Sequence, residues 1–599
     1  LRSNICPLFQ GARPAAALWS FLALLILAAP FPASAQVEVD RTCATCSRKK
    51  NDSLNLQIRK IRLNQVGYRP QDPHKAAFVA DPSTTTFAIQ ELSSGRVAHT
   101  GTLRGVGSHS GGAMSIRGAF NSTTDLYNLS RPARSEALHR ADFGSLVEPG
   151  TYVLVCGKDT SASFQIDARV YNQVFETSLK FFGSNRCGKT DSWIHAACHL
   201  KDGDALGAGR AGSLTGGWHD CGDHGKFSPT VAYAAVTLAM TYAFWPQKGE
   251  DFYGKSYNDT LPFGTDGIPD VLHEAKIGAD YILKLYQASK TDGLVEKGDM
   301  YHSVGMGPGM DHQYWDVPEN QDAQSRNRGG PSRPVKAGIG ANVAGSYAAA
   351  LAFFAWGWEP YDPAYARECL AAATEIYDKI VMARRNTTTT MPCCYTGGGN
   401  GGNSSDDEGL AALALWYASK DPRFGKDLVS NPDLGSNPTA VFNDGEFPSG
   451  IMAKVPYHHG GWTTDYENAH AFVLYGLVKL IVGTPAQAAA HGLSAALADS
   501  LKEDAIVALR ESIRIGSNGS AKIGSINADP PYNGVFTSVD WGYNRYNMGM
   551  VTELFMYWDL TGSEDHYKVG MDNLNYNLGM NSWDISFVMG TGDKNLQHP

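Results

Sequence analysis

Two features that define large classes of proteins are missing from this sequence: an excess of basic residues and, after residue 29, a long apolar run. Lysine and arginine together number 51 against 60 aspartates and glutamates, which leaves a net charge of −9. An acidic chain does not attract polyanions, so nucleic acid is excluded as a partner. No stretch beyond residue 29 approaches the roughly 20 apolar residues that a membrane-spanning helix needs.

The first 35 residues have the pattern of a secretory signal peptide. Two arginines, Arg2 and Arg13, precede an apolar run from Ala15 to Ala29, and the small residues Ala33-Ser34-Ala35 follow it. We expect cleavage before Gln36, which would release an extracellular protein that has no membrane partner. An uncleaved anchor helix is the alternative. Because no initiator methionine is present, the reading frame is expected to start further upstream.

Other features agree with export. Acceptor tripeptides for N-glycosylation begin at Asn51, Asn121, Asn128, Asn258, Asn386, Asn403 and Asn518. Residues 36–58 form a polar linker that contains Cys43 and Cys46. Since no second cysteine pair supports a zinc or redox site here, a local disulfide is the expected state in an exported chain.

Residues 59–168 contain short segments of strand character, separated by Gly, Pro, Asp and Ser. The predicted strands are residues 61–66, 75–79, 86–91, 97–103, 151–156 and 163–166. Regular short strands of this kind predict a β-sandwich. The intervening residues 105–136, which are rich in Ser, Gly and Asn, are expected to form a long mobile loop. We assign this domain a packing role, because it has no acid, base or metal cluster.

From residue 169 to residue 599 apolar residues recur at helical spacing, which predicts an all-α domain. The predicted helices are residues 171–182, 229–244, 268–287, 342–355, 363–382, 407–419, 468–482, 488–512 and 546–560. Long loops rich in Gly, Asp and Trp lie between them. Such a pattern indicates a helical scaffold that carries its chemistry on loops at one end.

Polar side chains and glycines are densest in residues 216–227. Asp220 and Asp223 are three residues apart, close enough for both carboxylates to meet one bound water. Such a pair suits general-base catalysis, in which one carboxylate takes the proton and the other holds the water. The glycines allow close approach of the backbone to a ligand. A plain surface turn is the alternative, since Asp and Gly are also good turn formers.

Cysteine and histidine residues lead into this segment. Cys187, Cys198, His199 and His219 offer two thiolates and two imidazoles, which is a tetrahedral zinc set. The alternative is a Cys187–Cys198 disulfide with two solvated histidines.

The stretch Gly216-Gly217-Trp218-His219-Asp220-Cys221-Gly222-Asp223, followed by Lys226-Phe227, resembles the nucleophilic-water motif of glycoside hydrolase family 9, the inverting cellulases and their relatives. The resemblance implies that Asp223 is the catalytic base and that Asp220 orients the water. Cys221 departs from the family, which more often has alanine there.

Residues 61–70 resemble the opening of the immunoglobulin-like domain that precedes some family 9 catalytic domains. The resemblance therefore implies an immunoglobulin-like β-sandwich (59–168) followed by a catalytic domain (169–599) with the six-hairpin (α/α)6 toroid. Members with this layout often carry zinc at positions that match Cys187, Cys198, His199 and His219, so structural zinc is implied. Calcium is also common in the family, but its ligands are not identified in this sequence.

Residues 311–315 resemble the family's Asp-His-x-x-Trp loop, which lines the substrate cleft. Trp315 would stack on a pyranose ring and His312 would bond a hydroxyl, and Trp462 is a further candidate platform. Core packing is the alternative for these aromatic residues. Residues 267–274 and 406–408 resemble helix starts of the family and are interpreted as structural, with acids that favour the helix dipole.

Residues 576–590 resemble the approach to the family's second catalytic block, which continues to a general-acid glutamate. We expect that glutamate beyond Pro599. The combined prediction is a secreted, inverting endo-β-1,4-glucanase (cellulase), a monomer that binds β-1,4-glucan polysaccharide or oligosaccharide. The alternatives are an exo-β-glucosaminidase of the same family and a noncatalytic glycan-binding protein.

Overall fold

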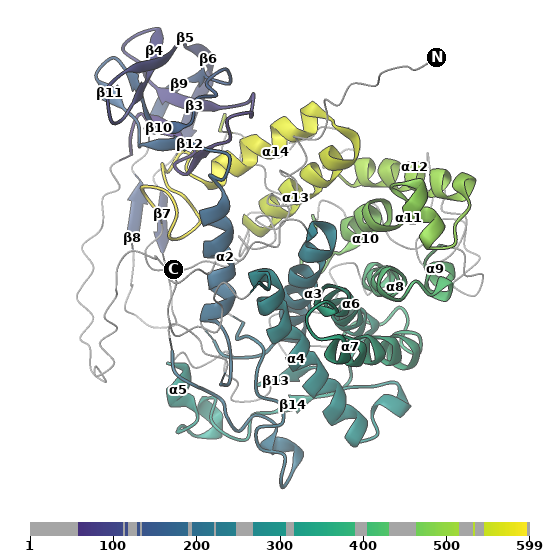
Figure 1. Cartoon of the computed structure of the whole chain (residues 1–599). Helices are drawn as coiled ribbons and strands as arrows, with labels where there is room; N and C mark the ends of the chain where they lie inside the picture. The colour runs from purple at the N-terminus through teal and green to yellow at the C-terminus, as the bar shows by residue number, and fades with distance from the viewer. Residues whose placement is uncertain are drawn as a thin grey trace, which may run out of the picture. The chain divides into compact units, whose positions relative to one another are not determined.

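The computed structural model describes residues 58–111, 114–117, 128–131, 134–189, 195–220, 223–246, 267–306, 317–389, 404–429, 463–513, 531–532 and 544–595. The chain folds into two compact units (Figure 1). One unit takes its described residues from Ile26–Ser178, Lys522–Val551 and Glu564–Pro599, and the other from Leu179–Ala521 and Thr552–Ser563. The predicted signal peptide, and the predicted linker as far as residue 57, lie outside the described residues.

The first unit contains a β-sandwich, which confirms the fold predicted from the short strands. One sheet has the strand order β1-β3-β9-β6, and the other has the order β2-β12-β10-β4-β5 with β11 paired to β10. The strands of the two sheets are β1 (Ile61–Leu63), β2 (Gly67–Tyr68), β3 (Ala76–Ala80), β4 (Thr86–Glu91), β5 (Val97–Thr102), β6 (Arg104–Gly111), β9 (Arg134–Asp142), β10 (Gly150–Cys156), β11 (Asp159–Thr160) and β12 (Phe164–Ile166). Strands β2 and β12 are parallel, whereas β4 and β10 are antiparallel.

The sandwich core follows from the period-2 alternation of its strands. In β10, Tyr152 and Leu154 are buried, while Val153 between them is partly exposed. Tyr68 packs edge-on against Phe143 with ring centroids 5.2 Å apart. Its hydroxyl donates to the carbonyl oxygen of Ala76 at 2.6 Å, so the polar end of this buried ring is satisfied.

The prediction of a long loop over residues 105–136 is wrong for the part of that stretch that the structure describes. Strand β6 pairs along β9 from Arg104↔Arg140 to Gly111↔Arg134, and β7 (Met114–Arg117) pairs with β8 (Asn128–Arg131). Strand β6 leaves most of its side chains exposed, so backbone hydrogen bonds rather than an apolar face hold it in the sheet. The buried residues of β9 include Glu136 and Arg140, and these charges hide the apolar alternation.

Residues near the C-terminus pack on the sandwich within the same unit. Helix α14 (Glu564–Asn577) and the segment after it contribute Tyr576, Met580 and Trp583 to an apolar cluster with Phe78 of β3 and Leu138 of β9. Ion pairs reinforce this packing, with the Arg59 Nε to Asp584 Oδ2 distance at 2.7 Å and Arg140 Nη1 to Asp572 Oδ1 at 3.3 Å.

The second unit is helical, as the 3.6-residue periodicity predicts. Its helices, with the two at its boundaries, are α2 (Asn172–Ser184), α3 (Ser228–Phe244), α4 (Asp270–Thr291), α5 (Pro318–Gln321), α6 (Ala341–Trp358), α7 (Pro363–Ile376), α8 (Ser405–Ser419), α9 (Pro422–Val429), α10 (His470–Gly476), α11 (Pro485–Ala490), α12 (Ala495–Ser512) and α13 (Asn544–Thr561). Within the described residues, every helix is too short or too polar to cross a bilayer.

Buried and half-exposed helices alternate along the chain of this unit. Helix α6 is buried along almost its whole length and packs against α3, α4, α7 and α8. Helix α7, the next in sequence, buries only one side. A helix that is apolar all round requires neighbours on all sides, and α6 has them (Figure 1). This pairing of inner and outer helices is the arrangement that the toroid prediction requires.

Several helix predictions differ from the structure, and the short helices α5 and α9 were not predicted. The predicted helix over residues 488–512 is two helices, α11 and α12, because the chain turns at Gly492, which has φ of +75°. Helix α14 was not predicted, because most of its turns carry polar residues and its apolar periodicity is weak.

Candidate functional site

The loop that carries Asp220 and Asp223 is closed by backbone hydrogen bonds just before α3. The amide of Asp220 donates to the carbonyl oxygen of Gly225 at 3.0 Å, and the amide of Lys226 donates to Val304 O at 2.9 Å. The Asp220–Gly225 bond closes the chain from residue 220 to residue 225 into a short loop. Cys221 and Gly222 lie outside the described residues.

The two carboxylates have different surroundings. Asp223 is fully buried, and its Oδ1 accepts a hydrogen bond from the amide of Gly225 at 2.9 Å. Asp220 is partly exposed, and its Oδ1 accepts a hydrogen bond from the hydroxyl of Thr230 at 2.6 Å. A Cβ atom at Gly225 would lie 2.8 Å from the Phe227 ring and 3.2 Å from Asp223 Oδ1. Glycine is therefore required where the loop closes.

A buried group of three charged residues, which we call the ion triad, supports this loop. Lys226 Nζ lies 2.6 Å from Asp202 Oδ2, and Arg333 Nη1 lies 2.8 Å from the same oxygen. Lys226 also donates to the carbonyl oxygens of Leu214 and Gly216 at 2.8 and 3.1 Å. Sequence reasoning missed Asp202 and Arg333, which are far from the loop in the chain and belong to no local pattern.

The four predicted metal ligands lie together in the structure. Donor atoms of Cys187, Cys198, His199 and His219 are all within 4.8 Å of one another, and all four residues are buried. Both cysteines are free thiols, so the alternative disulfide is not formed. Cys198 Sγ is 3.5 Å from His219 Nε2, and Cys187 Sγ is 3.7 Å from His199 Nδ1. Tetrahedral zinc with ordinary Zn–S and Zn–N bonds places such atoms about 3.6 Å apart, so this set, the metal cluster, fits a metal ion.

Backbone contacts bring these ligands together. The amide of Cys187 donates to Gly217 O at 2.9 Å, and the amide of Cys198 donates to Gly188 O at 3.2 Å. His199 adopts φ of +51°, a conformation that non-glycine residues rarely take and that the surrounding contacts must hold.

The protonation states in the metal cluster also suit ligation. Burial lowers the pKa of His219 to about 4, which keeps the imidazole neutral. For Cys187, burial opposes ionisation, but the hydrogen bond with Cys198 and the charge of Lys226 hold the pKa well below its usual value. The same hydrogen bond raises the pKa of Cys198. Metal ligation requires neutral imidazole and thiolate, so His219 and Cys187 are in the binding form, whereas Cys198 would release its proton when a cation binds.

The predicted substrate-binding residues His312, Trp315 and Trp462 lie outside the described residues, and their roles stay predictions. The described chain resumes near them at Val317 and Thr463.

The helix starts that sequence reasoning interpreted as structural do have buried partners. Glu274 of α4 accepts a hydrogen bond from the Trp218 indole at 2.8 Å and pairs with Arg186. At the start of α8, Asp406 accepts a hydrogen bond from the Ala469 amide at 2.8 Å, and burial raises its pKa to about 6. These carboxylates connect segments of the helical unit.

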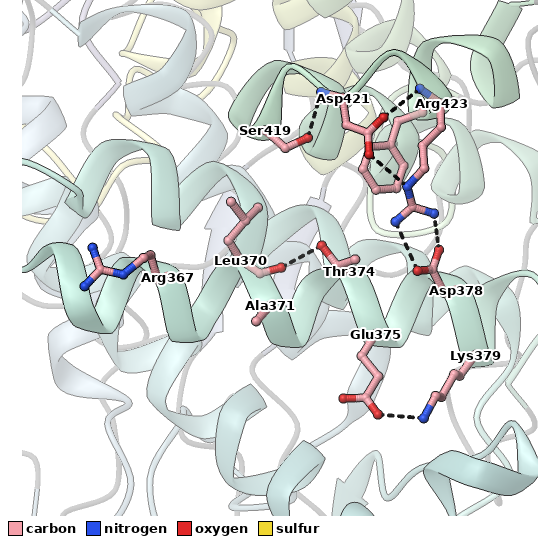
Figure 2. A pocket seen from close by; sticks show the side chains of 11 residues that line it. Arg367, Leu370, Ala371, Thr374, Glu375, Asp378, Lys379, Ser419, Asp421 and Arg423 are labelled. Carbon is pink, nitrogen blue, oxygen red and sulfur yellow. Dashed lines mark hydrogen bonds and ion pairs between the residues drawn. The ribbon is translucent and has the colours of Figure 1, made fainter.

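A groove of about 550 Å³ lies between α7 and the junction of α8 and α9 (Figure 2). The carboxylates that line it pair with cations, as Figure 2 shows for Arg423, which bonds both carboxylate oxygens of Asp378 at 2.6 and 3.0 Å. Lys379 pairs with Glu375 in the same groove at 2.9 Å. Because these carboxylates form ion pairs with lysine and arginine side chains, the groove does not resemble an acid–base site.

Comparison with known proteins gives matches for both parts of the chain. Residues 171–599 match the family described as "Glycosyl hydrolase family 9", and residues 57–161 match the "Cellulase N-terminal ig-like domain". "Endoglucanase D" of Acetivibrio thermocellus is 27% identical over 330 residues, which cover 53% of this chain and 45% of that protein. The chain therefore spans less than half the length of this relative.

Solved structures share the fold. The crystal structure of a metagenome-derived glycoside hydrolase family 9 endoglucanase is similar with a TM-score of 0.62 and 24% identity, covering 89% of this chain and 86% of that one. A Zn-binding triple mutant of the family 9 endoglucanase J30 is similar with a TM-score of 0.58 and 20% identity, over 89% and 86% of the two chains. The predicted order of an immunoglobulin-like sandwich and an (α/α)6 domain is thereby confirmed.

Proposed function

The chain belongs to glycosyl hydrolase family 9, and from this premise we propose that it is a secreted, inverting endoglucanase that hydrolyses β-1,4-glucosidic bonds in cellulose or related β-glucans. The observation that carries the proposal is the closed loop that contains Asp220 and Asp223 and gives the two carboxylates unlike environments. A single displacement requires a carboxylate that deprotonates the attacking water and a separate acid that protonates the leaving oxygen, and these two aspartates would supply the water side.

In this proposal Asp223 is the general base. It takes one proton from the water as the water oxygen attacks the anomeric carbon, while Asp220 accepts a hydrogen bond from the other O–H, whose hydrogen stays on the new hydroxyl. The glycosidic bond breaks, and the leaving oxygen takes a proton from a general-acid carboxyl group. Attack from the face opposite the leaving group inverts the anomeric configuration.

The difference in surroundings supports this division of roles. The amide of Gly225 fixes one oxygen of the buried Asp223, so the carboxylate has one defined orientation. Asp220 is partly exposed and is held by the Thr230 hydroxyl, which leaves it next to solvent. A positioned base contributes about 10²–10⁴-fold to the rate.

We propose that the metal cluster holds zinc as a structural ion. Its two thiolates and two imidazoles fill a tetrahedral shell, which leaves no open position for a reacting water. The ion would fix the segments around Cys187 and Cys198 against His219, next to Asp220. The family 9 relative with a Zn-binding variant is consistent with this choice of metal.

The test is reducing-end release by the full-length protein from carboxymethylcellulose and from chitosan oligomers. Asp223→Asn should lower kcat on carboxymethylcellulose at least about 100-fold, with melting temperature unchanged. Asp421→Asn is the matched control, because Asp421 is partly exposed and its carboxylate bonds the amide and the guanidinium of Arg423 in α9. Cleavage of chitosan oligomers alone would replace the proposal with the exo-β-glucosaminidase, and binding of glycans without cleavage would favour the glycan-binding protein.

Inversion and secretion need separate measurements. Proton NMR of the first products should show α-anomers released from β-linked glucan, and β-anomers would contradict a single displacement. Sequencing of the protein from the culture medium should give an N-terminus at Gln36. Retention of the protein in the membrane fraction would favour an uncleaved anchor.

A further inference from the structure

One side chain bridges the metal cluster and the loop of the two carboxylates. Gln321, the last residue of α5, is fully buried, and its Oε1 lies 2.5 Å from His199 Nε2 and 2.6 Å from His224 Nδ1. His199 belongs to the metal cluster, and His224 directly follows Asp223. A single oxygen therefore contacts one ring from each site.

The chemistry of the metal cluster determines how this bridge is protonated. His199 presents Nδ1 to Cys187 Sγ, so Nδ1 must carry the lone pair that would bind a metal. The proton of the neutral ring then resides on Nε2, which must donate. The atom of Gln321 that faces Nε2 must accept, which fixes the amide with its carbonyl oxygen toward the rings.

The same carbonyl oxygen has a second lone pair, and His224 supplies the second donor. With Nδ1–H donated to Gln321, the His224 ring has one orientation and one tautomer. The backbone of His224 is also held, because its carbonyl oxygen accepts a hydrogen bond from Arg333. The residue after Asp223 is thus fixed at both its ring and its backbone.

The segment that carries Gln321 has a further contact with the metal side. Asp322 Oδ2 accepts a hydrogen bond from the amide of Leu200 at 2.9 Å. His199 and Leu200 are neighbours in the chain, so Gln321 and Asp322 bind the same turn. The bridge is therefore part of a two-residue attachment and not an isolated contact.

We propose that Gln321 is a positioning residue that couples the metal cluster to the loop of Asp220 and Asp223. Its carbonyl oxygen orients the His199 ring toward the metal cluster. The same oxygen fixes the ring of His224, the residue that follows the proposed base Asp223. The inference rests on the proposed function, since it assigns to Gln321 a role in the metal site and in the hydrolytic site proposed above.

The test compares Gln321→Leu, which removes the oxygen at similar volume, with Gln321→Glu, which keeps acceptor oxygens. In the full-length protein, Gln321→Leu should release zinc to a chromophoric chelator about 10–100-fold faster than wild type. In the zinc-saturated variant, kcat should fall about 10-fold with KM changed less than about 2-fold. Gln321→Glu should restore both quantities to within about 3-fold of wild type.

Hydrogen exchange separates this inference from the proposed function. In zinc-saturated Gln321→Leu, peptides that contain residues 223–226 should exchange about 10-fold faster than in wild type, whether or not the protein hydrolyses glucan. Gln287→Leu is the matched control, because the side chain of Gln287 is exposed and donates to the exposed Glu368. Wild-type zinc release, or wild-type exchange of residues 223–226 in the zinc-saturated variant, would overturn the coupling.

Discussion

Glu553 of α13 should make the helical unit less stable at neutral pH than at acid pH. It is 1% exposed, and its Oε1 accepts hydrogen bonds from the amide and the hydroxyl of Thr464 at 2.8 and 2.6 Å. Among the described residues, Oε2 meets no hydrogen-bond partner. Burial raises the pKa of Glu553 from 4.5 to about 7.

The sign of the effect follows from this raised pKa. The folded protein binds the proton of Glu553 more tightly than the unfolded chain does, so the carboxyl stabilises the fold fully below pH 4.5. That stabilisation is lost as the pH rises through about 7. The difference between the two pKa values corresponds to about 3 kcal/mol of unfolding free energy.

Glu553→Gln isolates this contribution. The amide keeps an oxygen for Thr464 and cannot ionise, so the variant should gain about 3 kcal/mol over wild type between pH 5 and pH 8. Urea unfolding followed by tryptophan fluorescence at several pH values measures this gain. Glu359→Gln is the control, because Glu359 is exposed at the end of α6. A difference between Glu553→Gln and wild type that stays constant from pH 5 to pH 8 would refute the reasoning.

Three further predictions concern the site. Asp202→Asn should lower the unfolding free energy by about 3–5 kcal/mol, because it leaves the buried charges of Lys226 and Arg333 without their carboxylate; a loss below about 1 kcal/mol in urea unfolding would contradict this. Gly225→Ala should lower kcat about 10-fold or more, since its Cβ would lie 3.2 Å from Asp223 Oδ1, and an unchanged kcat would show that the loop tolerates the side chain. Removal of the metal with 1,10-phenanthroline should lower the melting temperature and added zinc should restore it, whereas a melting temperature that ignores both would argue against a structural ion.

Much of the fold was predictable because its core follows simple periods. The residues of β10 alternate between buried and partly exposed, and α6 is apolar on all sides, so period 2 and period 3.6 are visible in the sequence. Strands β6 and β9 were missed because glycines in one and buried charges in the other break the pattern. Helix α14 was missed because its buried residues include several asparagines, which pattern reading treats as exposed.

The candidate site was predictable where its residues are neighbours in sequence or belong to a set of ligand types such as Cys187, Cys198, His199 and His219. Asp220 and Asp223, like Cys198 and His199, are close enough in the chain for their spacing to carry information. Gln321 gives no such signal, because its role depends on two rings that are distant in sequence and that the fold brings to one oxygen.

Lys226 explains why the short motif depends on the rest of the fold. It is a member of the motif, yet its counter-ion Asp202 precedes the loop and the second cation, Arg333, lies beyond α5. A buried ammonium is tolerated only with such partners, since a lone buried charge costs several kcal/mol. A chain that carried the motif without an acid at the position of Asp202 would therefore be expected to misplace Asp223. The pairing of Lys226 with Asp202, and not the motif alone, distinguishes the closed loop of this structure from a surface turn of the same composition.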